Sequence, residues 1–558
     1  MRRIYFIIAV VLISIQGQTA ELKDRVKEYT LKNGLRVLFV ERHGAPTFAA
    51  FTLFPSGRTD EPKGKAGIAH VVEHMLFKGT KTIGTKDYVK EALAIAKLDS
   101  LVTLLIYEKS NPMPDSIRIS KLEEEVGRAE KEAADYMKRD EKIDAIYSKN
   151  GVSGFNAGTG MDGTTYIVGL PSNKFELWAR ITADIIENTV FREFYKEKEV
   201  VMNEIRGGED EPEEIFWDEF MDMAFSVHPY GKPIAGKVED IQRLTIKDIK
   251  DFYLSQYRVS NAIIGIVGDL EFEELKLVMD KYFSHLPQAD TLIRITEVEP
   301  IQTEERRKVI ELDAEPKIGI AYHIPTYPDF DTYVLKVISS ILSEGRTSRL
   351  YKNIVETKVA QSADCYSGTP GIRYPNLFVF GSQPITQHSV QEIETLFYSE
   401  IAKLKTKPVN EYELKKVKNQ VKASFIRRLQ SNWRIASQLV SFEGYFGGWE
   451  KTSEYIELID KVMPEDIIRV ANKYFTQENR TVLTSIKKVG ESKSLIELAI
   501  EYYREKAGKE PDEEMMKVFN GMMQQIENIE RMQKLSIPQS EKIQAIKQAI
   551  DALTGGER

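Results

Sequence analysis

The segment GIAHVVEHMLFKGT, residues 67–80, has helical spacing and carries two histidines four residues apart. On an α-helix, residues four apart lie one turn above each other on the same face. His70 and His74 can therefore present two imidazole nitrogens to one metal ion, and the carboxylate of Glu73 can reach the same side. Two imidazoles and a carboxylate suit zinc, which in catalytic sites keeps one position open for water. The segment therefore predicts a zinc site on a helix.

The same residues also indicate a hydrolytic reaction that uses metal-bound water. Zinc lowers the pKa of a bound water towards ~7. Glu73 beside it could take the proton of that water and later hand it to a leaving amine, which is the role of a general base in hydrolysis. The alternative is a structural pair of histidines bonded to backbone or carboxylate groups. A third ligand elsewhere in the chain is needed to decide between the two.

The helix predicted over KEKEVVMNEIRG, residues 196–207, offers that ligand. Glu197 and Glu204 are seven residues apart, which is two helical turns, so both project from one face. Glu204 would complete the zinc shell, and Glu197 would orient His70 or His74 from outside it. Glu199 lies on a different face and is expected to be solvated.

The length and composition favour a multidomain globular α+β protein. A chain of 558 residues is too long for one ordinary hydrophobic core. Residues 29–56 predict two strands. The segments FYLSQYRVSNAIIGIVG from Phe252 and NKYFTQENRTVLTSIKK from Asn472 each give a helix end, a polar turn and an apolar strand. This weak repeat predicts two similar α+β halves in tandem.

The predicted domain limits follow from these patterns. We expect a first domain over residues 21–286, a linker over 287–305 and a second domain over 306–489. Residues from about 95 to 147 are rich in Lys, Glu, Asp and Ala and predict a charged helical hairpin inserted in the first domain. Residues 490–558 predict a charged helical tail.

Charge and cysteine content exclude some classes of function. The formal net charge is -8 and no basic tract stands out, so neither nucleic acid nor an anionic membrane surface is an expected partner. Cys365 is the only cysteine, which rules out an intrachain disulfide. We expect it to be a small buried hydrophobe rather than a nucleophile.

Residues 1–20 have the layout of a secretory signal peptide. Arg2 and Arg3 precede an apolar run from Ile4 to Ile15, after which the chain turns polar and small. The run is short for a membrane span, and no other stretch is long enough. The prediction is a periplasmic or exported bacterial protein with no stable membrane span after leader removal; a retained membrane anchor is the alternative.

Several motifs together resemble one family. HVVEH has the residue order of the inverzincins, reversed relative to the commoner zinc-protease motif. It is followed by FKGT, and the chain also contains GFNAGTGMDGTTYIV from residue 154, EVVMNEIRG from residue 199 and HPYGKPIAGKVEDIQRLTIKDIKDFY from residue 228. These motifs resemble the pitrilysin/insulinase family of zinc metallopeptidases, particularly its mitochondrial processing peptidase-like branch and bacterial relatives. The resemblance covers about residues 25–490 without the insertion.

The resemblance implies a site and a fold. It implies one zinc ion per chain bound by His70, His74 and Glu204, with Glu73 as the general base and Glu197 as a supporting catalytic carboxylate. It also implies two homologous sandwich halves that face each other like a clamshell around a peptide.

The resemblance further implies how a substrate is held. In relatives, the strand that matches GFNAGTGMDGTTYIV lines the cleft and a peptide adds to it as an extra strand. Asn156 and Ala157 fall at the matching substrate-binding positions. The alternative is that they are plain turn and strand residues.

One departure from the family concerns the second half. Many relatives contribute an Arg and a Tyr from this half to stabilise the oxyanion, whereas this chain has Val355 and Gln361 at those positions. We therefore expect a homologous partner chain to supply the Arg and Tyr, in a heterodimer or a homodimer. The expected function is that of a zinc-dependent metalloendopeptidase acting on short or unfolded polypeptides. The alternative is a non-catalytic scaffold or assembly subunit of the same fold.

Overall fold

The computed structural model describes most of the chain as two compact units. The described residues are 22–288, 294–488, 495–533, 542, 546–547 and 549–551. The predicted leader over residues 1–20 and part of the predicted 287–305 linker lie outside the described residues. The larger unit runs to Ile310 and resumes over Pro316–Ser485, and the smaller unit combines Glu311–Glu315 with the chain from Ile486. None of the helices in the described ranges has the length and hydrophobicity needed to cross a bilayer.

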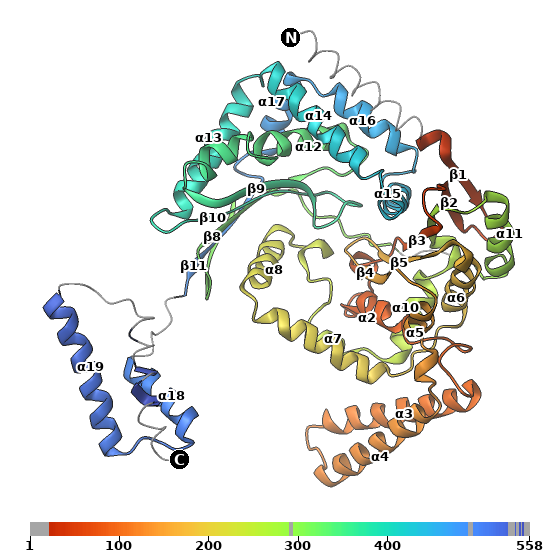
Figure 1. The fold of residues 1–558 in the computed structure, drawn as a ribbon, viewed down its shortest axis with the longest axis horizontal. Helices are drawn as coiled ribbons and strands as arrows, with labels where there is room; N and C mark the ends of the chain where they lie inside the picture. The colour runs from red at the N-terminus through yellow and green to blue at the C-terminus, as the bar shows by residue number, and fades with distance from the viewer. Residues whose placement is uncertain are drawn as a thin grey trace. The chain divides into compact units, whose positions relative to one another are not determined.

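The first half of the larger unit is built on a six-stranded sheet (Figure 1). Its strands are β1 (Val26–Thr30), β2 (Arg36–Glu41), β3 (Thr47–Phe54), β4 (Gly154–Thr159), β5 (Thr164–Pro171) and β6 (Ile263–Gly268). They lie in the order β1-β2-β6-β3-β5-β4. Strands β2 and β6 are parallel, and the other neighbours are antiparallel. Every residue of β6 is buried, as expected for a central strand covered on both faces.

The second half repeats this sheet. Its strands are β7 (Arg306–Leu312), β8 (Lys317–Ile324), β9 (Ala360–Thr369), β10 (Asn376–Pro384) and β11 (Arg480–Lys487), in the order β7-β11-β8-β10-β9. Counted along the chain within each half, β2 to β6 and β7 to β11 have the same spatial order, first-fifth-second-fourth-third. The prediction of two similar α+β halves is therefore confirmed. The repeat noticed in the sequence ends in β6 and β11, which occupy the same place in the two sheets.

Helices pack against one face of each sheet and form a hydrophobic core with it. The first half contains α2 (Ile68–Met75), α5 (Ile143–Lys149), α6 (Phe175–Asn188), α7 (Phe194–Glu209), α8 (Pro212–Ala224), α9 (Val238–Arg243), α10 (Ile246–Gln256) and α11 (Phe272–Phe283). The second half contains α12 (Phe330–Ser343), α13 (Val390–Thr406), α14 (Glu411–Arg427), α15 (Asn432–Tyr445), α16 (Lys451–Lys461) and α17 (Pro464–Tyr474). Helices α2, α6, α7, α10 and α11 share one core with the first sheet, and α12 to α14, α16 and α17 share another with the second.

Helix α15 of the second half covers the opposite face of the first sheet. Along β2, Val37 belongs to the core shared with α2, whereas its neighbour Leu38 belongs to the core shared with α15. Because successive strand residues point to opposite faces, α2 and α15 lie on the two sides of the same sheet. From α15, Leu439 and Val440 pack into this second core. The two halves are thus joined by a hydrophobic contact as well as by the chain.

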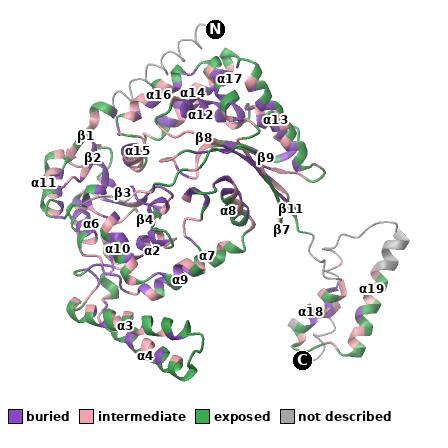
Figure 2. Ribbon diagram, turned by 180° about the vertical axis from the view of Figure 1, so that it is seen from behind, coloured by how far each residue is buried: buried purple, intermediate pink, exposed green. Residues whose placement is uncertain are grey.

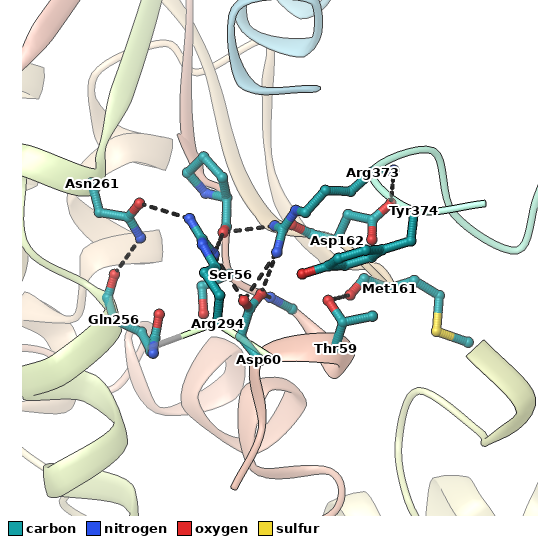
Figure 3. A network of polar contacts seen from close by, with 12 residues as sticks. Ser56, Thr59, Asp60, Met161, Asp162, Gln256, Asn261, Arg294, Arg373 and Tyr374 are labelled. Atoms are coloured by element: carbon teal, nitrogen blue, oxygen red, sulfur yellow. Dashed lines mark hydrogen bonds and ion pairs between the residues drawn. The ribbon is translucent and has the colours of Figure 1, made fainter. Parts of the chain in front are cut away.

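A polar network also ties the two halves together (Figure 3). The Arg373 guanidinium, from the loop between β9 and β10, donates to both carboxylate oxygens of Asp60 at 2.9 Å and to the Pro55 carbonyl at 2.7 Å. The Asp162 carboxylate, in the turn between β4 and β5, accepts the Arg373 N–H at 3.0 Å and the Tyr230 hydroxyl at 2.7 Å. Asp60 and Asp162 are buried residues, and Arg373 of the second half binds both of their carboxylates, together with Arg294 at Asp60 and Tyr230 at Asp162.

The predicted hairpin insertion is observed with different limits. It consists of α3 (Tyr88–Lys109) and α4 (Ser116–Asp135), so it begins before residue 95 and ends before residue 147. The Asp87 side chain accepts the N–H of Lys90 and so starts α3 by capping it. Much of the hairpin surface is exposed (Figure 2). Its own core is small and consists of Leu98, Val102 and Ala129 with partly buried neighbours.

The smaller unit contains α18 (Leu495–Ala507) and α19 (Glu513–Gln533). Its buried core comprises Ala499, Tyr503, Phe519, Ile546 and Ile550. The helical character predicted for the tail is therefore observed in its described residues.

Cys365 lies on β9 and is buried. Burial raises the pKa of its thiol to about 12, so the thiolate that would act as a nucleophile is strongly disfavoured. This agrees with the predicted role of a small core residue.

Candidate metal centre

Helices α2 and α7 bring the three predicted ligands together. The Nε2 atoms of His70 and His74 are 3.2 Å apart. The Glu204 carboxylate oxygen Oε2 lies 3.9 Å from Nε2 of His70 and 3.7 Å from Nε2 of His74. These three side chains form a group that can hold a metal ion. Glu197 and Glu204, two turns apart on α7, both face the turn of α2 that carries the two histidines, as their spacing predicts.

The distances fit a zinc ion. Zn–N bonds of 2.0–2.1 Å in a tetrahedral shell place two ligand nitrogens about 3.3 Å apart. The observed separation of 3.2 Å between the two histidine nitrogens is close to this value. The Glu204 side chain is 49% exposed, so the shell opens towards solvent on the carboxylate side. An open side is what a catalytic zinc site needs for water and substrate.

Glu197 fixes the orientation of His74. Its Oε1 lies 3.1 Å from Nδ1 of His74, and its Oε2 lies 2.5 Å from Nζ of Lys78. An ionised carboxylate only accepts hydrogen bonds, so Nδ1 of His74 must donate, which leaves the lone pair of Nε2 for a metal. Lys78 was not predicted from the sequence, although it follows His74 by four residues in the FKGT motif. Within the described residues, Nδ1 of His70 is buried and has no hydrogen-bond partner.

The pKa shifts agree with these contacts. Burial lowers the pKa of His70, and the neighbouring His74 lowers it further, which favours a neutral imidazole that can bind metal. Burial also opposes charge on His74, but its hydrogen bond to Glu197 and the nearby carboxylates outweigh burial and raise its pKa. Burial alone would raise the pKa of Glu197, yet the hydrogen bonds from His74 and Lys78 lower it on balance, so this carboxylate stays ionised.

Glu73 connects the metal ligands to strand β4. It lies on α2 between the two histidines and is only 9% exposed. Its Oε2 accepts the hydroxyl of Thr159, the last residue of β4, at 2.5 Å. Thr159 was not among the residues predicted from the sequence. Burial raises the pKa of the neighbouring Tyr166 and Tyr257, so both phenols stay neutral beside this carboxylate.

Strand β4 is the last strand of its sheet, and β5 is its only neighbour among the described strands. Asn156 is exposed and Ala157 is half-buried on this strand. The structure therefore places both predicted substrate-binding residues on an edge whose outer backbone groups are available for pairing. An extended peptide can add to such an edge as a further strand.

The start of α2 is held by its own contacts. Gly67 has a φ of +80°, in the left-handed region that favours glycine, and a Cβ there would collide with the Ala235 carbonyl. The Glu61 carboxylate accepts the N–H groups of Gly67 at 2.9 Å and Ala69 at 3.0 Å, and it pairs with Arg58 at 2.8 Å. These contacts fix the N-terminus of α2 up to Ala69, the residue that precedes His70.

Arg192, which was also not predicted from the sequence, forms a buried ion pair near the candidate metal centre. Its guanidinium donates to both oxygens of Glu91, at 2.6 and 3.1 Å. It also donates to the carbonyls of Lys78, Thr80 and Ile83 at 2.7, 2.9 and 3.0 Å. The Arg192 and Glu91 side chains are 2% and 1% exposed. This buried ion pair joins the segment after α2, the base of the hairpin and the segment before α7.

In the described part of the second half, Val355 and Gln361 stand at the positions where the Arg and Tyr were expected. Val355 is half-buried and Gln361 is an exposed residue of β9. Arg349 forms an ion pair with Glu413 at 2.7 Å, and Arg373 is held in the network at Asp60. Both of these arginines are therefore already engaged in structural ion pairs.

Known families match the two halves separately. Residues 36–98 and 132–238 match the family described as Insulinase (Peptidase family M16), and residues 243–421 match the one described as Peptidase M16 inactive domain. The gap in the first match falls within the hairpin. A zinc protease of Helicobacter pylori, PqqE, is 26% identical over 467 residues, which cover 81% of this chain and 91% of that protein. A probable mitochondrial-processing peptidase subunit beta of Arabidopsis thaliana is 23% identical over 460 residues, which cover 80% and 75%.

Solved structures show the same fold. A protease from Helicobacter pylori matches with a TM-score of 0.67 and 24% identity, over 82% of this chain and 99% of that one. The periplasmic protease PqqL from Escherichia coli matches with a TM-score of 0.64 and 15% identity, over 89% of this chain and 49% of that one. These likenesses show the fold, and the family is shown by the two family matches, which together span most of the larger unit. The chain belongs to the insulinase family of peptidases, family M16.

Proposed function

We propose that this protein is a zinc metalloendopeptidase that holds one zinc ion per chain and hydrolyses peptide bonds of short or unfolded polypeptides. The observation that carries the proposal is the convergence of His70, His74 and Glu204 beside the buried carboxylate of Glu73. The relatives named as zinc proteases support it.

The edge strand β4 supports the choice of substrate. A peptide that adds to β4 must be extended and must have unpaired backbone groups, which short or unfolded chains have and folded domains lack. Asn156 and Ala157 would lie beside such a peptide. Thr159, at the end of the same strand, holds Glu73 through its hydroxyl. The strand therefore connects the place where the peptide binds to the place where it is cut.

Each residue of the site has its own role in the proposed hydrolysis. A zinc ion bound by the three ligands would supply Lewis-acid activation of water and of the scissile carbonyl. Glu73 takes the proton of the attacking water and transfers it to the leaving amine. Thr159 holds one oxygen of Glu73, so the other oxygen is left for this proton transfer. Glu197 and Lys78 keep His74 in the tautomer that binds metal.

The alternative function is a non-catalytic scaffold or assembly subunit. Val355 and Gln361, at the positions of the expected Arg and Tyr, favour it. Purified protein should contain about one zinc per chain by elemental analysis, and a chelator should abolish peptide cleavage until zinc is restored. The scaffold function predicts neither of these results, so a lack of stoichiometric zinc or cleavage that does not respond to the chelator would decide against the endopeptidase.

We also propose that a homologous partner chain completes the site with an Arg and a Tyr. Mixing the protein with a homologue encoded next to it should raise kcat/KM for a peptide by about 100-fold or more, because one missing oxyanion donor costs that much. Titrating the partner at constant enzyme checks the stoichiometry. Equal activity with and without the partner would refute this proposal while leaving the zinc site untouched.

For the place of action we propose export to the periplasm. The leader layout of residues 1–20 is the basis for this. A related fold occurs in a protein described as periplasmic. N-terminal sequencing of the mature protein from a periplasmic extract tests it, and recovery of the intact leader in the membrane fraction would favour a retained anchor.

A further inference from the structure

An arginine-lined pocket lies on the α15 side of the first sheet. It has a volume of about 610 Å³ and is lined by Arg427 and Arg428 at the end of α14, Arg434 on α15, and the rings of Phe51 and Trp433. Hydroxyl groups from α14 and α15 also line it, and no described lining residue is an Asp or a Glu. All three arginines are exposed, and none forms an ion pair with another described residue. Such a pocket suits an anion.

The sheet connects this pocket to the edge strand β4. In the strand register, Phe51 of β3 faces Ile167 of β5, which in turn faces Asn156 of β4. Residues directly opposite each other share one face of a sheet. Phe51 packs in the core shared with α15, so Asn156 points to the same face as the pocket. The Phe51 and Trp433 rings are 5.6 Å apart.

Trp433 places the pocket near one end of β4. A Cβ on Gly154, the first residue of β4, would lie 2.8 Å from the Trp433 ring, and one on Gly169 would lie 2.5 Å from it. Glycine at these positions allows the indole to rest directly on the strands. The opposite end of β4 is Thr159, which bonds to Glu73. The catalytic carboxylate and the arginine pocket therefore mark the two ends of the same edge strand.

The length of β4 sets the distance between cleavage and recognition. Gly154 and Thr159 are five residues apart, and a strand rises about 3.3 Å per residue, so the two ends are roughly 16 Å apart. A peptide paired along β4 would extend from the scissile bond at the Thr159 end to the pocket at the Gly154 end. Its side chains alternate between the faces of the sheet, so those on the α15 face would approach the arginines.

We infer that Arg427, Arg428 and Arg434 form a specificity site for a carboxylate of the peptide substrate, located four to six residues from the scissile bond. The inference rests on the proposed function and names the substrate class of that site. The carboxylate can come from an Asp or Glu side chain or from a free C-terminus, because a guanidinium group binds both in the same way.

The test uses one peptide that the full-length protein cleaves at a single bond. A single Glu is moved through the positions on each side of this bond, with Gln at the same position as the matched peptide. The ratio of kcat/KM between the Glu and Gln peptides should rise to roughly 10-fold at four to six residues from the bond and stay near one elsewhere. Peptides that end at this distance, with a free acid or an amide, separate the terminal carboxylate from the side chain.

Variants of the three arginines test whether they cause the preference for Glu over Gln. In Arg434→Gln, and in Arg427→Gln combined with Arg428→Gln, the Glu/Gln ratio should fall towards one. Arg128→Gln is the matched control, because Arg128 is an exposed arginine of the hairpin helix α4, and its ratio should stay as in the wild type. A flat ratio at all positions in the wild type would overturn the inference, as would a peak that survives both pocket variants.

If the protein has no peptidase activity, peptide binding still tests the arginine pocket. If no peptide is cleaved, fluorescence anisotropy of labelled Glu and Gln peptides with the wild-type protein decides the inference by binding alone. Tighter binding of the Glu peptide, lost in Arg434→Gln, would support the pocket even without catalysis. Equal binding of the two peptides would overturn it.

Discussion

The variant Glu73→Gln should keep its zinc and lose at least ~100-fold in kcat for peptide cleavage. The glutamine amide has nearly the same size and can still accept the Thr159 hydroxyl, so the geometry of α2 should be unchanged. It cannot take a proton from water, so the acid–base step fails while metal binding by His70, His74 and Glu204 continues. Elemental analysis and single-turnover kinetics of the same preparation measure both quantities.

The matched control for this experiment is Glu199→Gln. Glu199 is an exposed residue of α7, the helix that carries Glu204, and it lies outside the group of metal ligands. Its substitution should leave zinc content and kcat within about twofold of the wild type, as for surface changes away from a site. Cleavage by Glu73→Gln at the wild-type rate, with zinc retained, would mean that another group accepts the proton.

The variant Arg192→Met should be destabilised by about 3–5 kcal/mol. Removing one partner of a buried ion pair leaves the other charge uncompensated, and here the Glu91 carboxylate and three carbonyl groups lose their donor. Methionine has a similar length, so packing is mostly preserved. The free energy of unfolding from urea titration, followed by tryptophan fluorescence, measures the change.

Two further variants separate charge from packing at this position. Combining Glu91→Gln with Arg192→Met should recover part of the lost stability, because the unpaired charge is then removed. Arg180→Met is the control, since Arg180 is exposed on α6, and it should change the free energy of unfolding by less than about 0.5 kcal/mol. If Arg192→Met were as stable as this control, the buried pair would contribute nothing to holding the hairpin and ligand helices together.

The sequence predicted the parts of the fold that have strong local periodicity. The helix–turn–strand repeat at Phe252 and Asn472 corresponds to equivalent strands in two sheets of the same topology. The two strands predicted within residues 29–56 correspond to β2 and β3, and the structure adds a strand over Val26–Thr30 that the sequence did not predict. The additional strand, β1, pairs with β2 around a turn in which Gly34 has a φ of +84°. The residues of β1 are mostly exposed and lack a clear apolar alternation, so periodicity alone could not reveal it.

Some residues of the candidate site could likewise be predicted from local sequence patterns, and others could not. The positions of His70, His74, Glu197 and Glu204 follow from helical spacing within two short segments, and the structure places all four where that spacing requires. Thr159 and Arg192 could not be predicted, because each contacts a partner roughly a hundred residues away along the chain. A threonine on a strand or an arginine before a helix carries no local signal of such a partner.

The contact between α15 and the first sheet means that the second half supports a candidate metal site whose three described ligands all lie in the first half. Without α15, the apolar side chains of Leu38 and Phe51 would face water, and without Arg373 the buried Asp60 would lose a cation. The half that matches the inactive domain of the family can therefore support the candidate metal site through packing alone, because α15 covers the face of the sheet opposite to α2.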